Sequence, residues 1–224
     1  MKNLKFYLPL LLFSFFFFPA KSQEKNRAKI QASTEVVAAF SAMKEGIPKE
    51  LFAVTEGIII IPSMKNAGLG VAGKRGKGIA MVKNTNGTWS NPVFVTITGA
   101  SVGLQAGYQS VDLVLIFKNK ETLQKIGRGS FTLGGDVSVT AGPVGRNSTA
   151  STDYKLDAEA YSYSKAKGLF AGISLSGSSL DVDEKANTSF YKKNEDAKTL
   201  FASSNNTASA ETKSLQKTLR GLFL

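Results

Sequence analysis

The chain of 224 residues contains no cysteine and no histidine. The lack of cysteine excludes a disulfide framework, a thiol nucleophile and a thiolate metal site. The lack of histidine removes the commonest general base and the commonest metal ligand. The acidic residues are scattered, so no paired-carboxylate centre stands out in their place. These absences argue against an enzyme and against a bound metal or cofactor, and they favour a binding protein.

The only apolar run that approaches the length of a membrane span lies at the N-terminus. Residues 1–5 are basic, and residues 6–18 are apolar but too short to cross a bilayer comfortably. Ala20-Lys21-Ser22 then has the small-x-small pattern of a cleavage site. We therefore expect a signal peptide at residues 1–22 and a single exported domain at 23–224, in the periplasm, at the outer membrane or outside the cell. An uncleaved anchor is the alternative.

Export would leave a basic protein. Cleavage removes three of the 28 basic residues and none of the 17 acidic ones, which leaves a net charge of +8. A basic surface favours anionic partners such as phospholipid headgroups. Charge alone does not separate lipid from nucleic acid, but an exported protein is not expected to meet nucleic acid.

Hydrophobic periodicity predicts a sheet in the middle of the chain and helices at both ends. The stretch 89–117 begins with strict apolar alternation, crosses three glycines spaced four residues apart, and closes in an apolar run. Glycines inside a strand pattern mark bends or bulges, which suit a curled sheet. Residues 24–45 and 210–222 have helical patterns, and the first helix either covers the sheet or lies on a membrane surface. The expected fold class is α+β, a curled antiparallel (barrel-like) sheet with N-terminal and C-terminal helices.

Shorter patterns fill the rest of this order. Gly and Asn at 84–87 predict a hairpin turn, and the polar stretch 194–209 indicates a linker. We also expect short helices at 48–55, 118–127 and 181–193, and strands at 57–61, 79–83, 131–141, 158–164 and 169–175.

A glycine-rich segment at residues 68–78 is the best candidate for binding an anion. It holds five glycines, three cations and no acid. In a tight turn its backbone N–H groups could form an anion nest, and Arg75 could hold a phosphate with two hydrogen bonds. The alternative is a solvated hairpin whose lysines protect a strand edge. The turns at 142–146 and 165–168 are weaker candidates, and we expect these cations to converge on one face as a lipid-headgroup site: Lys74, Arg75, Lys77, Arg146, Lys165 and Lys167.

Four sequence blocks carry a family resemblance. They are GASVGLQAGYQSVDLVLIF at 99–117, LGGDVSVTAGPVGR at 133–146, YSYSKAKGLFAGISLSGSSLDVD at 161–183, and Asn187 with Tyr191. Together they resemble the SYLF domain, over about residues 28–222. The resemblance implies a non-catalytic domain that binds membrane lipids. Its eukaryotic members are cytosolic and associated with phosphoinositides and, in the yeast actin-patch branch, with actin filaments, whereas the export signal here points to a secreted bacterial branch.

These observations predict an exported, non-catalytic protein that binds anionic phospholipid or a membrane surface, with no cofactor and no metal. The alternative is a structural or protein-interaction module of the cell envelope, in which the basic turns contact a partner protein. The helical patterns and the apolar strand at 58–61, which needs protein on both faces, argue against a small outer-membrane barrel.

Overall fold

The structure is a computed structural model that describes residues 18–43, 47–69, 71–102, 107–128, 131–142, 158–170, 173–204 and 208–222. Its helices are α1 (Phe18–Ser41), α2 (Lys49–Ala53), α3 (Lys120–Gln124), the 3-10 helix η1 (Lys125–Arg128), α4 (Glu184–Tyr191), α5 (Ala197–Ala202) and α6 (Ala210–Leu222). Its strands are β1 (Gly57–Leu69), β2 (Val71–Val82), β3 (Val93–Val102), β4 (Gly107–Phe117), β5 (Phe131–Leu133), β6 (Val139–Ala141), β7 (Ala160–Ala166), β8 (Leu169–Phe170) and β9 (Ser178–Val182).

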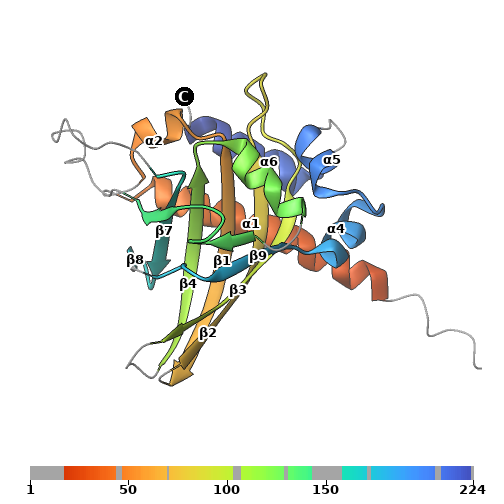
Figure 1. Ribbon diagram of the computed structural model, residues 1–224. Helices are drawn as coiled ribbons and strands as arrows, with labels where there is room; N and C mark the ends of the chain where they lie inside the picture. Colours follow the sequence, from red (N-terminus) through yellow and green to blue (C-terminus); the bar gives the residue numbers. More distant parts are fainter. Residues whose placement is uncertain are drawn as a thin grey trace, which may run out of the picture.

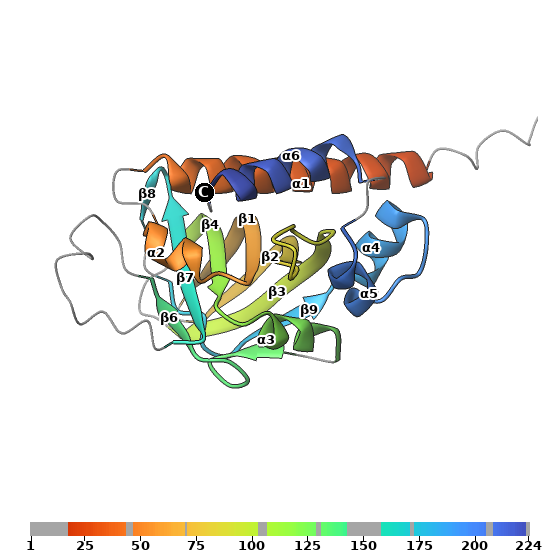
Figure 2. The same ribbon diagram turned by 90° about the horizontal axis from the view of Figure 1, so that it is seen from above.

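One curled sheet organises the molecule. The strand order is β5-β9-β3-β2-β1-β4-β7-β6, with β8 paired to β7, and every pairing except β6 with β7 is antiparallel. Figures 1 and 2 show the sheet bending round into a nearly closed barrel, with helices from both chain ends lying together on its outside. The expected α+β class and barrel-like sheet are therefore confirmed. The far ends of β1 to β4 run beyond the helices (Figure 1).

Apolar cores lie on both sides of the sheet. The side chains of Ile58 and Ile60 pack under α1, α2 and α6, on what we call the α1 side. Ile59 and Ile61 face the opposite, inner side, which α3, α5 and β5 cover. All four are at most 1% exposed, so the expectation that this run is buried on both faces is confirmed. Successive strand residues point to opposite faces, and this alternation decides where each cation lies.

A bulge in β1 resets this alternation. The pairing of β1 with β4 shifts between Ile61 and Met64, which leaves one extra residue in β1. Ser63 sits there with a φ of 52°, and its N–H donates to Asp112 Oδ1 at 2.9 Å. Met64 returns to the inner core, so the next residue, Lys65, lies on the α1 side.

The structure corrects the predicted glycine-rich turn. Residues 71–80 pair continuously with β3, so Lys74, Arg75 and Lys77 stand on strand β2. Two of the glycines, Gly76 and Gly78, serve close packing instead. A Cβ at Gly76 would lie 2.5 Å from Ile61 Cγ2, and one at Gly78 would overlap the backbone of Ile60. Glycine here reflects the crowding at the β1 bulge, so the backbone N–H groups belong to the sheet and do not form a nest.

Two further expectations were wrong. The stretch 194–209 was expected to be a linker, but it contains α5, whose N-cap Asp196 accepts a hydrogen bond from Thr199 N–H at 2.7 Å. Leu200 and Phe201 of this helix are buried in the inner core. The single strand expected at 131–141 is two short strands, β5 and β6, which stand at opposite ends of the strand order and are joined by the turn at residues 134–138.

Candidate functional site

Neighbouring cations on β2 point to opposite sides of the sheet. Arg75 and Lys77 are four and two residues from Ile79 on the same strand, so their side chains point to the α1 side, where Ile79 packs. Both cations are exposed. Lys74, directly before Arg75, points to the inner side. On the neighbouring strand β1, Lys65 is paired directly with Arg75. The Nζ atom of Lys65 is 3.1 Å from Ser110 Oγ on β4.

The outermost described cations on the α1 side form what we call the distal basic row, Lys65 and Arg75. The strand register aligns this pair with Ser110 on one flank and with Thr98 on the other. Two cations therefore lie side by side, and the other described residues aligned with them across the strands are neutral. Like charges placed directly opposite each other across strands destabilise a sheet. An anion bound over this row would relieve that repulsion.

An exposed aromatic ring adjoins the row. Tyr108 lies two residues before Ser110 and on the same side of β4, and 68% of its surface is exposed. The Nζ atom of Lys65 lies 5.5 Å from the centre of this ring. A tyrosine beside cations is a combination suited to the boundary between water and lipid.

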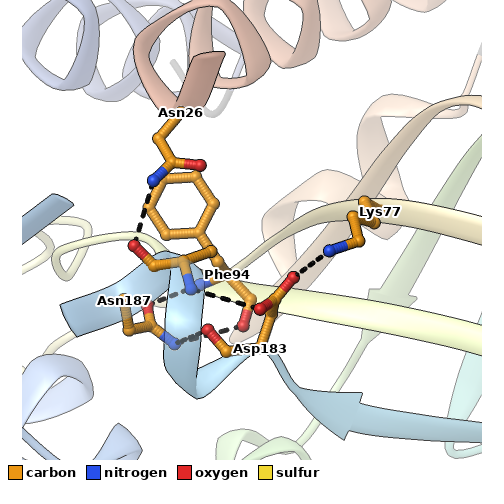
Figure 3. Close-up of polar contacts among 6 residues, drawn as sticks. Asn26, Lys77, Phe94, Asp183 and Asn187 are labelled. Carbon is orange, nitrogen blue, oxygen red and sulfur yellow. Dashed lines mark hydrogen bonds and ion pairs between the residues drawn. The ribbon is translucent and has the colours of Figure 1, made fainter. Parts of the chain in front are cut away.

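Nearer α1, cations and carboxylates are mixed. Lys77 Nζ forms a 2.6 Å ion pair with Asp183, whose other carboxylate oxygen accepts the Ala186 N–H at 3.1 Å and caps α4 (Figure 3). Burial raises the pKa of Asp183, but the hydrogen bonds from Lys77 and Ala186 outweigh burial and hold it below its ordinary value. The charge of Lys77 is therefore already matched. Burial, then repulsion from Lys25 and Lys77, lowers the pKa of Lys29 on α1.

The end of β7 and the turn that follows it carry the last two described cations of the predicted site. Lys165 is paired with Asp112 on β4, and its Nζ lies 5.5 Å from the ring centre of Phe40 on α1. Lys167 is exposed in the turn, with a φ of 49°. Leu169 directly after it is 73% exposed. The predicted turn is confirmed, and it presents a cation and an apolar side chain to solvent together.

Lys74 has a different environment. It is 5% exposed, and its Nζ donates to the carbonyl of Ser174, in the segment that crosses the inner side before β9. Burial lowers the pKa of this lysine. Beside it, Asn66 Oδ1 and Ser178 Oγ are buried without a hydrogen-bond partner in the described part of the chain. Lys74 therefore does not share a surface with Arg75.

Of the six predicted cations, the structure brings Arg75, Lys77 and Lys165 to the α1 side. Lys167 projects from the turn after β7, Lys74 faces inward, and Arg146 lies outside the described residues. Sequence analysis missed Lys65, because it did not use Pro62, which lies in the bulge that turns Lys65 toward Arg75 and is typical of such an irregularity. Among the described residues, no three potential metal ligands of the Asp, Glu, His or Cys type come together. No helix in the described ranges combines the length and apolarity that crossing a membrane requires.

Comparison with known proteins identifies the family. The Ysc84 family, described as "Las17-binding protein actin regulator", matches residues 98–222. The chain belongs to the Ysc84/SYLF family. An SH3 domain-containing protein of Schizosaccharomyces pombe is 38% identical over 185 residues, which is 81% of this chain and 43% of that protein. "LAS seventeen-binding protein 3" of Saccharomyces cerevisiae is 35% identical over 81% of this chain and 40% of its own length.

A vertebrate relative is similar to the same extent. The "SH3 domain-containing YSC84-like protein 1" of Xenopus laevis is 33% identical over 76% of this chain and 51% of its own length. The chain thus spans about half the length, or less, of the curated relatives that it matches. One of the three names describes a binding protein, and none of the three describes an enzyme.

Two residues of the last SYLF block attach α4 to β3. Asn187 Oδ1 accepts the Phe94 N–H at 2.9 Å, and Asn187 Nδ2 donates to the Phe94 carbonyl at 3.2 Å (Figure 3). Tyr191 donates its hydroxyl hydrogen to the Pro92 carbonyl at 2.6 Å. In this SYLF domain, the pair thus positions Asp183 against Lys77.

Proposed function

We propose that this SYLF protein is a non-catalytic module that binds anionic phospholipid surfaces through its α1 side. The observation that carries the proposal is the distal basic row, where Lys65 and Arg75 lie side by side with exposed Tyr108 next to them. Nearer α1, Lys77 already forms an ion pair with Asp183, and Lys165 stands in register with Asp112. The outermost cations are therefore the ones available to a headgroup.

Electrostatics favours this partner. A lysine or arginine close to an anionic membrane contributes about 1 kcal/mol of attraction, and salt screens it. Lys167 and Leu169 at the β7–β8 turn offer a second cation and an apolar side chain at the surface. Weak contacts of this kind add up when several engage the same membrane. Membrane binding through this side is therefore expected to be salt-dependent and to tolerate different anionic headgroups.

Neutralising the distal basic row tests the proposal. Lys65→Gln and Arg75→Gln should each weaken binding to anionic vesicles about fivefold, and about 30-fold together, at about 1 kcal/mol per charge. Vesicle co-sedimentation at rising salt concentrations measures the effect. Lys125→Gln is the matched control, because Lys125 is exposed on η1, which covers the inner side. Equal losses in the control and in the row variants would contradict the proposal.

A protein partner is the second candidate. The family description and the yeast relative's name refer to binding of Las17 and to actin regulation. An acidic protein surface fits the distal basic row as an anionic membrane does. Co-sedimentation with actin filaments, run with the same variants, separates the two candidates. Binding to filaments and not to anionic vesicles would favour the protein partner.

A further inference from the structure

A pocket of about 360 Å³ lies where α1, α4 and α6 meet. Figure 2 shows α1 and α6 side by side, with α4 close to the N-terminal half of α1. This volume falls within the range of small-molecule sites. The pocket is separate from the distal basic row, which lies on β1 and β2 beyond the helices.

The pocket carries charges of both signs. Arg27 and Lys193 line it together with Glu195, and Glu211 lies against Arg27. The pairs among these four groups are long: 3.5 Å from Arg27 to Glu211 and 3.9 Å from Lys193 to Glu195. Both cations therefore retain donors for another anion. The Oε2 atom of Glu211 is buried and has no hydrogen-bond partner in the described part of the chain.

One wall of the pocket is aromatic and rigid. Phe190 and Tyr191 line it, and their rings meet edge to face with centroids 4.9 Å apart. Phe190 also packs on Phe94 at 5.2 Å. An aromatic wall beside carboxylates is the chemistry that recognises an organic ammonium group. The positive charges of Arg27 and Lys193 suit a phosphate.

We propose that this pocket binds a phosphoalkylammonium group, such as phosphoethanolamine or phosphocholine. Arg27 and Lys193 hold the phosphate, while Glu195 and the aromatic wall hold the ammonium. The group is either the headgroup of a zwitterionic phospholipid or a free phosphoamine. The lipid form rests on the proposed function, because it needs the protein to meet a membrane. The site then adds headgroup selectivity to the general attraction supplied by the distal basic row.

Calorimetric titration with soluble phosphoethanolamine, inorganic phosphate and ethanolamine tests the chemistry. Phosphoethanolamine should bind more tightly than either half alone. Arg27→Gln should weaken phosphate and phosphoethanolamine at least about tenfold and leave ethanolamine unchanged, because it removes a charge-assisted hydrogen bond. Glu195→Gln should weaken ethanolamine and phosphoethanolamine and leave phosphate unchanged. Lys217→Gln, exposed on α6, is the matched control.

A second variant fills the pocket without changing its charge. Ala208→Trp should abolish phosphoethanolamine binding while thermal unfolding remains near that of the parent protein, since Ala208 lines the pocket and is only partly buried. No binding of phosphoethanolamine to the parent protein, or equal affinity for phosphate and phosphoethanolamine, would overturn the proposal.

Vesicles identify the source of the group. If the protein binds more strongly to vesicles that contain phosphatidylethanolamine, and Arg27→Gln abolishes this gain, the ligand is the lipid headgroup. Binding of soluble phosphoethanolamine without that gain assigns a free phosphoamine. The Lys65→Gln/Arg75→Gln variant should keep its affinity for soluble phosphoethanolamine. A failure of the membrane proposal is thereby distinguished from a failure of the pocket.

Discussion

At the scale of single residues, adjacent cations in one motif have different surroundings. Lys74 is 5% exposed and held by the Ser174 carbonyl, whereas Arg75 is exposed beside Lys65. Both carry the same formal charge in the sequence. Strand alternation separates them, so the motif contains one interior lysine and one surface arginine. Only the second is suited to meet an anionic surface.

Replacing Lys74 with methionine should leave binding to anionic vesicles unchanged, because the side chain points inward. It should also change the pH dependence of stability. The pKa of Lys74 is lowered in the folded state, so the unfolded chain holds more protons as pH rises toward the ordinary lysine value. The free energy of unfolding of the wild-type protein should therefore rise, relative to that of Lys74→Met, between neutral pH and about pH 10.

Urea denaturation of both proteins across this pH range measures the difference. The exposed Lys125→Met serves as the control and should show no such trend. A wild-type protein that loses stability relative to Lys74→Met as pH rises would contradict the inferred burial of charge. Loss of vesicle binding in Lys74→Met would place this lysine in the binding surface.

At the scale of elements, the position of α4 depends on one buried amide. Asn187 is 3% exposed, and its side chain takes the place of a neighbouring strand beside Phe94 of β3. The amide oxygen accepts the Phe94 N–H, and the amide nitrogen donates to the Phe94 carbonyl. The same side chain donates to the Asp183 carbonyl at 3.2 Å. At the other end of the network, Asn26 on α1 donates to the Ala186 carbonyl at 3.1 Å (Figure 3). α1, α4 and β3 thus meet at a single polar junction, which Asp183 extends to Lys77 on β2.

Asn187→Ala should lower the free energy of unfolding by about 3 kcal/mol, because it leaves the buried Phe94 N–H without its acceptor. Thr188→Ala, on the exposed side of the same helix, should cost less than about 1 kcal/mol. Urea denaturation with intrinsic fluorescence measures both. Similar costs for the two variants would show that the junction contributes little to stability.

Elements with strong local signals were predicted well from the sequence. The final helix at 210–222, the hairpin turn at 84–87 and the strand at 57–61 all appear where periodicity and turn residues placed them. The segment at 68–78 contains the reversal between β1 and β2, as the hairpin alternative expected, since Leu69 pairs with Val71. The anion nest was wrong, because Gly76 and Gly78 meet crowding at Ile60 and Ile61 within the sheet. α5 was missed because six residues give too little periodicity to detect.

At the scale of the whole molecule, the curled sheet and its terminal helices followed from the order of patterns along the chain. The pairing of Lys65 with Arg75 did not, since it depends on the bulge at Pro62 and Ser63 and on the register of β1 with β2. The pocket between α1, α4 and α6 was not predicted either. Its lining residues are far apart in sequence, and no short motif joins them.

Export remains a prediction that concerns the whole chain, because residues 1–17 lie outside the described ranges. The basic start, the apolar run and the Ala20-Lys21-Ser22 pattern support cleavage after Ser22. The mass of the intact protein, purified from cells that make it, should correspond to a chain that begins at Gln23. A mass that includes Met1 would contradict cleavage.

The extra residue in β1 has a consequence for how this domain can change during evolution. Substitutions at Lys65 or Arg75 alter one side chain at a time. Gaining or losing one residue in the outer half of β1 would instead exchange its solvent-facing and interior side chains. We therefore expect descendants of this sequence to vary in composition there more readily than in length.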